Sequence, residues 1–243
     1  MNDARNTAPR NGKGAYDIRP LYLNCDAYLF DIDGTLLNSR DAVHYCAFHH
    51  AVRDVFGIEL RLDGIPVHGN TDIGILRAAL KRDGISDSEF EAKLPLALQQ
   101  MCAEATKNAH NMTPEVCPSV RNLLDSLRRA GKLMGVASGN LATIGWLKLK
   151  AAGLDEFFAF GSFSDNAEFR ADVFRNGVSE VRQRLREDAS VCVVGDTPSD
   201  VKAAREAGLS VIAVATGIFP MEELSQLHPD ACVSCCTELL PHF

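Results

Sequence analysis

The sequence predicts an α/β protein in which an all-helical segment interrupts a parallel-sheet core. Two observations lead to this prediction. From residue 132 onward, short apolar runs alternate with amphipathic segments, which is the pattern of parallel strands joined by right-handed helical crossovers. One further strand pattern comes much earlier, at residues 25–30, and residues 38–117 between the two regions contain no buried-strand pattern. With 243 residues, 46% of them hydrophobic, the chain is long enough for one such core with an insertion.

The first half of the chain is expected to supply one strand and then helices. The apolar run at 25–30 ends in a polar turn and is expected to be a strand. In residues 42–56 the apolar positions recur at helical spacing, and Gly57 is suited to end that helix. The same reasoning predicts further helices at residues 72–82, 89–108 and 120–130.

The second half is expected to alternate between the two element types. Strands are expected at residues 133–137, 157–161, 191–194 and 211–215. Helices are expected between them at residues 141–152, 171–186 and 200–207, and a short strand and a helix at the end. The predicted division is therefore a core of residues 25–37 and 118–243, a helical insertion of residues 38–117, and a polar, loosely ordered leader of residues 1–24.

Charge and hydropathy exclude several classes of function. The formal net charge of −7 provides no basic surface for nucleic acid or for an anionic membrane. No apolar stretch approaches the ~20 residues that span a bilayer, and residues 1–20 lack the apolar segment of a secretory signal. We therefore expect a cytoplasmic protein that binds neither nucleic acid nor membrane. The sequence leaves open whether it is a monomer or a homodimer.

The eight cysteines are expected to be free. Four of them fall in apolar segments, where a thiol packs as a small core side chain: Cys25, Cys46, Cys102 and Cys192. The cluster Cys232, Cys235 and Cys236 contains a C-x-x-C spacing but no second ligand pair, so a structural role is favoured over a zinc site.

Polar residues follow three of the expected strands. The first strand is followed by Asp31, Asp33, Gly34 and Thr35, the second by Ser138, Gly139 and Asn140, and the fourth by residues 195–200 (GDTPSD). In an open α/β sheet, the carboxyl ends of the strands form the ligand-binding edge. These residues are therefore the candidates for a functional site.

The residue types at this edge favour phosphoryl transfer. Four carboxylates there would repel one another unless a divalent cation lies among them, and an all-oxygen ligand set favours Mg²⁺. Ser138 lies at the start of an expected helix, where unpaired backbone N–H groups suit an anion. Residues 197–200 also fit a helix start, with Thr197 as N-cap, Pro198 at the first position and Asp200 in the first turn.

The same segments resemble a known family. Residues 31–39 (DIDGTLLNS) resemble the first motif, D-x-D-G-T-L, of haloacid dehalogenase-like (HAD) hydrolases. Ser138-Gly139-Asn140 resembles the second motif, and residues 195–208 (GDTPSDVKAAREAG) resemble the fourth. The insertion resembles the C1-type helical cap of the phosphoglycolate-phosphatase-like branch, as does the segment Gly69-Asn70-Thr71-Asp72 within it. The resemblance implies a Rossmann-like parallel-sheet core with an inserted cap.

The resemblance implies a role for each motif residue. Asp31 would be the nucleophile that forms an aspartyl-phosphate, and Asp33 the general acid and base. Mg²⁺ would be held by Asp31, the backbone carbonyl of Asp33 and Asp196, with Asp200 as a direct or indirect ligand. The phosphate group would be bound by residues of the first and second motifs and by one arginine: Thr35, Ser138, Gly139, Asn140 and Arg170.

Arg170 is included because the third motif departs from the family. The family usually has a lysine there, but residues 165–172 (DNAEFRAD) contain none, and Arg170 is the best-placed cation. Lys148 and Lys150 are the alternatives, although both are expected to face solvent from the preceding helix. His44, His49 and His50 show no clean ligand spacing, so surface or packing roles are favoured for them.

The expected function is Mg²⁺-dependent hydrolysis of a small phosphorylated metabolite, whose identity the sequence does not specify. A phosphosugar mutase of the same family, using the same Asp31 and Asp33, is the main alternative. A non-catalytic binding protein on the same fold is disfavoured because Asp31, Asp33 and Asp196 are all present. Dehalogenase and phosphonatase chemistry would require different motif residues.

Overall fold

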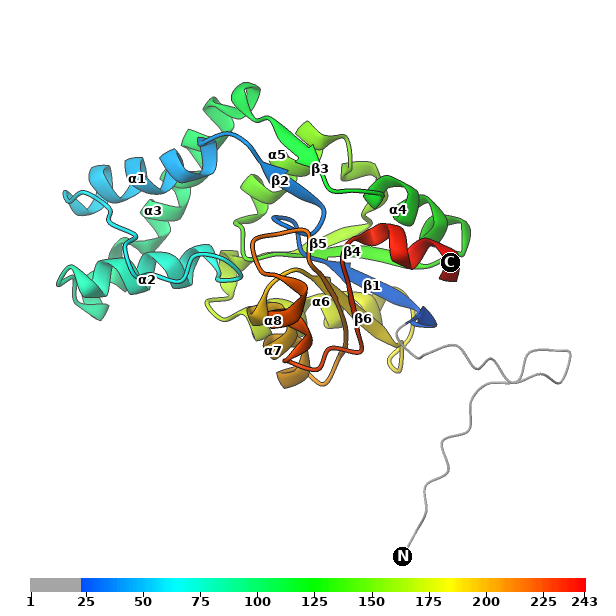
Figure 1. The fold of residues 1–243 in the computed structure, drawn as a ribbon. Coiled ribbons are helices and arrows are strands. Elements are labelled where there is room, and N and C mark those ends of the chain that lie inside the picture. The colour runs from blue at the N-terminus through cyan, green and yellow to red at the C-terminus, as the bar shows by residue number, and fades with distance from the viewer. Residues whose placement is uncertain (1–22) are drawn as a thin grey trace, which may run out of the picture.

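The core is a six-stranded parallel sheet, which confirms the predicted α/β class (Figure 1). The computed structural model describes residues 23–243, so residues 1–22 of the expected leader lie outside the described part. The strand order is β5-β4-β1-β6-β7-β8. The strands are β1 (Ala27–Phe30), β4 (Leu133–Ala137), β5 (Phe160–Ser162), β6 (Val191–Gly195), β7 (Ser210–Val214) and β8 (Ala231–Val233).

Each face of the sheet is covered by helices, because successive side chains of a strand point to opposite faces. Tyr28 and Phe30 of β1 pack in the core on the face covered by α4 (Val120–Arg129) and α5 (Ala142–Ala152). Ala27 and Leu29 of β1 pack on the other face, against α6 (Arg170–Arg184) and α7 (Pro198–Glu206). Both layers are visible in Figure 1. The central strand is therefore apolar on both faces, as buried parallel strands are.

The register of the sheet brings three polar strand ends together. Phe30, the last residue of β1, pairs with Val136 of β4 and with Val194 of β6. Polar residues follow these positions by one or two places in all three strands, so they lie at the same edge of the sheet. This is the arrangement that the sequence predicted for the candidate site.

The helical insertion forms a unit beside this edge. Its helices are α1 (Val43–Phe56), α2 (Asp72–Arg82) and α3 (Asp87–Lys107), which group together in Figure 1. Their shared apolar core includes Leu76 and Met101. It also takes in two residues of the sheet domain, Leu141 just before α5 and Ile144 within it. The insertion therefore packs directly against the start of α5.

The chain enters and leaves the insertion through a two-stranded antiparallel ribbon that the sequence analysis missed. Its strands are β2 (Leu37–Ser39) and β3 (Pro114–Val116). They are short and largely polar, so no apolar alternation marks them. Residues 40–113, between the two strands, are called the cap below. The predicted boundaries at 38 and 117 fall within β2 and just after β3.

Smaller differences concern ends and turns. The strand expected at 157–161 lies at Phe160–Ser162, because Asp155–Phe157 form a 3₁₀ turn. The short helix α8 (Met221–Ser225) was not predicted, and the C-terminal helix is a 3₁₀ segment, Cys236–His242. Cys46 was expected to be a core residue and is exposed. Within residues 23–243, no helix combines the length and apolar character needed to cross a bilayer.

Candidate active site

Asp31 lies directly after β1 and its side chain is buried. Its backbone N–H donates to the carbonyl of Val194 in β6, which fixes the start of the loop against the neighbouring strand. Gly34 then turns the chain with a φ of +87°, and a side chain there would collide with the carboxylate of Asp196. Glycine is therefore required for the first loop to approach the loop after β6 so closely.

Three buried carboxylates and one guanidinium form what we call the carboxylate cluster: Asp31, Asp196, Asp200 and Arg170. Carboxylate oxygens of the three aspartates lie within 4.8 Å of one another. Arg170, the first residue of α6, places Nη2 2.7 Å from Oδ1 of Asp31 and 2.7 Å from Oδ1 of Asp200. The cation that the sequence analysis selected from the third motif thus lies between two of the acids.

The charges in this cluster are unbalanced. Burial raises the pKa of Asp31 to about 6 despite the nearby Arg170. Burial, together with the charges of Asp200 and Asp31, raises the pKa of Asp196 to about 9. One guanidinium therefore does not offset three buried acids. An additional cation held by oxygen ligands would do so, and the donor set fits a hard divalent ion such as Mg²⁺.

Asp200 also organises the start of α7. Its Oδ2 accepts from the backbone N–H and the hydroxyl of Thr197, and the Thr197 hydroxyl in turn accepts from the N–H of Asp200. This is the helix start predicted from the sequence, with Pro198 at the first position. The other oxygen of Asp200 accepts from Nε and Nη2 of Arg170. The same residue therefore caps a helix and orients the guanidinium that faces Asp31.

Asp33 belongs to a second group, in which the prediction for Lys148 proves wrong. Lys148 was expected to face solvent, yet it is buried, and its Nζ lies 2.7 Å from Oδ2 of Asp33. Asn140 donates to the same oxygen at 2.8 Å. Desolvation would raise the pKa of Asp33, but Lys148 and Asn140 outweigh it and lower this pKa to about 2.

His44 extends this group into the cap, which corrects the surface or packing role expected for it. Lys148 Nζ lies 3.1 Å from Nδ1 of His44, and Nε2 of His44 lies 3.1 Å from Oδ2 of Asp72. An ammonium group can only donate, so Nδ1 accepts and Nε2 carries the proton that His44 donates to Asp72. We call Asp33, Asn140, Lys148, His44 and Asp72 the cap–core network.

A helical pattern in the sequence could have identified Lys148. It lies four residues after Ile144 and four before Ala152, and both of these are buried. Positions four apart share a helix face, so Lys148 belongs to the buried face of α5, whereas Lys150 is exposed. Asp72 carried no comparable signal, because the first turn of a helix favours an acidic residue for local reasons.

Hydrogen bonds join the second motif and the start of α5 to the cap. The N–H groups of Leu141 and Ala142, at the start of α5, were expected to suit a substrate anion, but they donate to the carboxylates of Asp72 and Asp165. Asp72 also donates its own N–H to the carbonyl of Gly139 at 2.8 Å. A side chain on Gly139 would collide with the backbone of Asn70. Glycine at this position therefore permits the close seam between cap and core.

The remaining predicted phosphate ligands differ in their placement. Ser138 does not cap α5, since its hydroxyl accepts from the side chain of Asn140 at 2.8 Å. Ser138, Gly139 and Asn140 all line the cavity described below. Thr35 is fully buried, and its hydroxyl donates to Oδ1 of Asp196 at 3.0 Å. Thr35 thus positions a carboxylate, which differs from the expected contact with phosphate.

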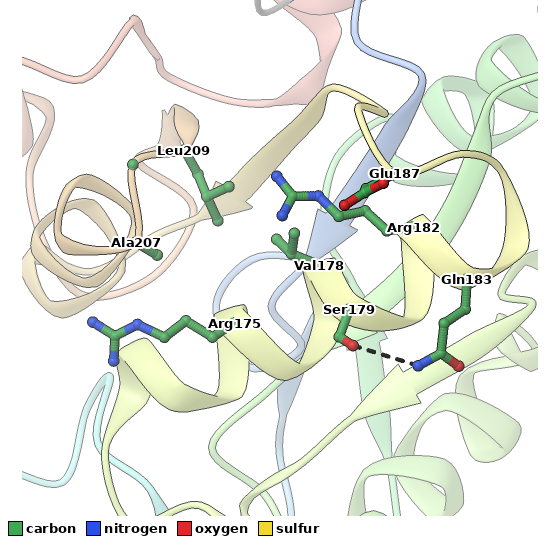
Figure 2. Close-up of a pocket in the computed structure, with 9 residues that line it drawn as sticks. Arg175, Val178, Ser179, Arg182, Gln183, Glu187, Ala207 and Leu209 are labelled. Carbon is green, nitrogen blue, oxygen red and sulfur yellow. Dashed lines mark hydrogen bonds between the residues drawn. The ribbon is translucent and has the colours of Figure 1, made fainter.

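A cavity of about 830 Å³ lies over both groups. Its floor includes Asp31, Asp33 and Asp196, and its other wall comes from α1, α2 and the segment between them. A different hollow lies between α6 and the turn after α7, where Arg175, Arg182 and Leu209 line it (Figure 2). None of the candidate catalytic, phosphate-binding or metal-ligating residues lines this hollow, so the cavity between cap and core is the candidate active site.

The sequence and the fold both match known proteins. Residues 28–214 match the family described as haloacid dehalogenase-like hydrolase. The chain is 27% identical to the phosphoglycolate phosphatase of Synechococcus elongatus, over 88% of this chain and 95% of that protein. It is 25% identical to the pyrophosphatase PpaX of Bacillus velezensis, over 88% of this chain and 94% of that protein.

Solved structures agree in fold. CbbY from Rhodobacter sphaeroides in complex with phosphate aligns with a TM-score of 0.66 at 17% identity, covering 88% of this chain and 96% of CbbY. A haloacid dehalogenase-like family hydrolase from Streptococcus pneumoniae aligns with a TM-score of 0.59 at 21% identity, covering 90% and 98%. At these identities the likeness establishes the fold.

Proposed function

We propose that this chain, which belongs to the haloacid dehalogenase-like hydrolases, is a Mg²⁺-dependent phosphatase that hydrolyses a small phosphomonoester through an aspartyl-phosphate on Asp31. The observation that carries the proposal is the carboxylate cluster at the floor of the cavity. Buried acids with too little compensating charge would be stabilised by an added cation, and a cation beside a carboxylate and a guanidinium is suited to a phosphate group.

Asp31 is the proposed nucleophile. A carboxylate oxygen of Asp31 would form a bond to phosphorus while the bond from phosphorus to the ester oxygen breaks, which releases an alcohol. Water would then attack the aspartyl-phosphate, releasing inorganic phosphate and restoring the carboxylate. Dividing one difficult displacement into two easier ones is the advantage of such an intermediate.

Asp33 is the proposed acid and base in these two steps. To donate a proton to the departing ester oxygen it must first take one up, because its pKa in the free site is lowered to about 2; a bound anionic phosphate group would raise that pKa. It would later accept a proton from the attacking water. Its side chain lies at the cavity and is 41% exposed, whereas that of Asp31 is only 7% exposed. Lys148 and Asn140 hold one of its oxygens, so the carboxylate has a defined orientation at the edge of the site.

The proposed Mg²⁺ ligands are carboxylates of Asp31 and Asp196 and the backbone carbonyl of Asp33, with Asp200 as a direct or indirect ligand. When bound, the ion would offset the negative charge of the acids and of the phosphate group. Arg170 would add a second positive charge beside Asp31, and Ser138, Gly139 and Asn140 would contact the phosphate oxygens from the loop after β4.

The proposal is tested by measuring phosphate release from a panel of phosphomonoesters, with Mg²⁺ and with EDTA. Release that requires the metal supports the proposal. Absence of release from folded protein, together with interconversion of β-glucose 1-phosphate and glucose 6-phosphate, would instead identify the phosphosugar mutase. Absence of both would contradict catalysis by Asp31. Asp31→Asn is the matched control, because it keeps the shape of the side chain and removes the nucleophile.

A further inference from the structure

We propose that the substrate of this site has an uncharged leaving group with substantial apolar surface, and not a second anionic group. This inference rests on the proposed phosphatase function and deepens it. It separates this chain from enzymes that act on phosphoglycolate or pyrophosphate, both of which carry additional negative charge next to the reacting phosphate.

The cap side of the cavity carries an apolar patch. Tyr45 and Phe48 of α1 form it, together with Val67 from the segment before α2 and Ile75 of α2. On the sheet side, Ile218 follows β7 and also lines the cavity. Tyr45 is 55% exposed and Ile218 is 63% exposed, although both are large apolar side chains. Exposed apolar surface at the rim of a polar site is typical of a surface that a ligand covers.

Within the described residues, every lysine or arginine that lines the cavity is already paired with a carboxylate. Among the described residues that line the cavity, the only lysines and arginines are Arg40, Lys148 and Arg170. Arg170 is bound to Asp31 and Asp200, and Lys148 to Asp33. Arg40 is directed to Glu115, with Nη2 2.6 Å from its carboxylate. Arg170 and Lys148 thus belong to the reacting end of the site.

The two histidines that line the described cavity, His44 and His68, do not supply a binding group for a second anion either. His44 uses both ring nitrogens, one with Lys148 and the other with Asp72. His68 is exposed, so its ring is hydrated in the absence of substrate. A second anion would therefore gain little by exchanging water for either ring.

The cavity also contains negative charge away from the carboxylate cluster. Asp41 accepts hydrogen bonds from the N–H groups of Val43 and Thr113, and no described lysine or arginine pairs with it. Asp72 lies nearby in the lining and is buried. A carboxylate or a second phosphate would face these groups without a counter-charge, which costs free energy of binding. An uncharged leaving group avoids this cost and covers the apolar patch.

The size of the cavity agrees with a leaving group larger than glycolate. A volume of about 830 Å³ lies within the range of pockets that hold ligands with a ring or several rotatable bonds. A phosphate at the carboxylate cluster would leave most of this volume to the leaving group. Contact with Tyr45, Phe48 and Ile218 would then contribute to recognition.

The charge requirement is tested with two nearly isosteric substrates, 2-phosphoglycolate and its primary amide, in the presence of Mg²⁺. The amide replaces the second anion by an uncharged group of the same shape. We expect kcat/KM for the amide to exceed that for the acid by about tenfold or more, because the acid's carboxylate finds no partner. Equal values, or a preference for the acid, would overturn the inference.

The apolar requirement is tested with phenethyl phosphate and methyl phosphate. Tyr45→Ala and Ile218→Ala should lower kcat/KM for phenethyl phosphate by about five- to tenfold each, since each removes apolar contact area. The same variants should lower kcat/KM for methyl phosphate by a smaller factor, because its leaving group has little apolar surface to contact either side chain. Leu96→Ala and Met221→Ala are the controls, because these side chains are also exposed but do not line the cavity. Equal losses for both substrates would contradict the inference.

The two proposals fail in different ways. If the protein releases phosphate from 2-phosphoglycolate faster than from its amide, the phosphatase stands and the inference on the leaving group is overturned. If no phosphomonoester releases phosphate while the protein remains folded, the proposed function itself is overturned, and with it the inference that rests on it.

Discussion

The two halves of the active site differ in where their residues come from. The carboxylate cluster is built within the sheet domain, from the loops after β1 and β6 and the starts of α6 and α7. The cap–core network joins Asp33, Asn140 and Lys148 of the sheet domain to His44 and Asp72 of the cap. The first half can therefore form whatever the position of the cap, whereas the second depends on it.

The two halves also differ in what they contribute: the carboxylate cluster provides charge, and the cap–core network fixes the position of Asp33. In the carboxylate cluster, the buried acids outnumber the guanidinium, so the cluster is suited to hold a cation and a phosphate group. In the cap–core network, every proton of the Lys148 ammonium has an acceptor within 3.1 Å. Such a satisfied network fixes the orientation of Asp33 and ties it to the seam between cap and core. The following variants test whether the two halves behave as differently as their construction suggests.

The largest effect is expected from Asp31→Asn. The amide cannot serve as the nucleophile, so kcat should fall by about 10⁴-fold or more. The free energy of unfolding should not fall, because the substitution removes one of several buried like charges. Phosphate release and urea denaturation measure the two quantities, and retained turnover would refute the assignment of the nucleophile.

Arg170→Gln should reduce both activity and stability. Loss of the guanidinium should lower kcat by about 10²- to 10³-fold, since a charged group beside the phosphate is removed. It also leaves buried acids without their partner, so the free energy of unfolding without metal should fall by about 3–5 kcal/mol. Urea denaturation in EDTA measures this loss. Arg175→Gln, on the same helix but half exposed, is the control and should change little.

Lys148→Gln should have a smaller effect, mainly on kcat. Asp33 would keep its hydrogen bond from Asn140 but lose the ammonium that orients it, which should lower kcat by about 10- to 100-fold. Steady-state kinetics with a fixed substrate separate this from a change in KM. Lys150→Gln on the exposed face of the same helix should have no effect. If the two variants behave alike, Lys148 has no role in orienting Asp33.

His44→Asn is expected to have the smallest effect on catalysis. It removes the link between Lys148 and Asp72, so kcat/KM should fall by less than about tenfold. In a double-mutant cycle with Lys148→Gln, the coupling energy should be about 0.5–3 kcal/mol. His50→Asn, whose side chain pairs with Glu104 outside the cavity, is the control. Strict additivity of the His44 and Lys148 effects would show that cap and core are not linked through this contact.

Much of the carboxylate cluster could be predicted from the sequence, because local rules place its residues. Asp31 and Asp196 directly follow buried strands, and parallel pairing brings such positions to the same edge of a sheet. The helix start at Thr197 has a capping pattern that is complete within four residues. Arg170 was found because the family resemblance implies a cation in the third motif, and Arg170 is the only lysine or arginine in residues 165–172.

The cap–core network could not be predicted in the same way. Lys148 looked like an exposed helical lysine, since charged side chains are rarely buried without a partner, and its partners are 115 and 104 residues away along the chain. The N–H groups at the start of α5 were expected to be open to a ligand, but the cap supplies its own carboxylate there. These outcomes depend on how the cap docks onto the core, which no local pattern specifies.

Sequence patterns alone are enough to specify the fold class, the helical insertion and the acids at the strand ends. Hydrophobic periodicity and helix capping act over a few residues, and a parallel sheet brings the ends of all its strands to one edge. The tertiary structure decided which cation reaches which acid, how the cap meets the second motif, and which side chains form the cavity wall. These depend on contacts between segments distant in sequence, where burial makes a charged side chain bind whichever partner the docked domains provide.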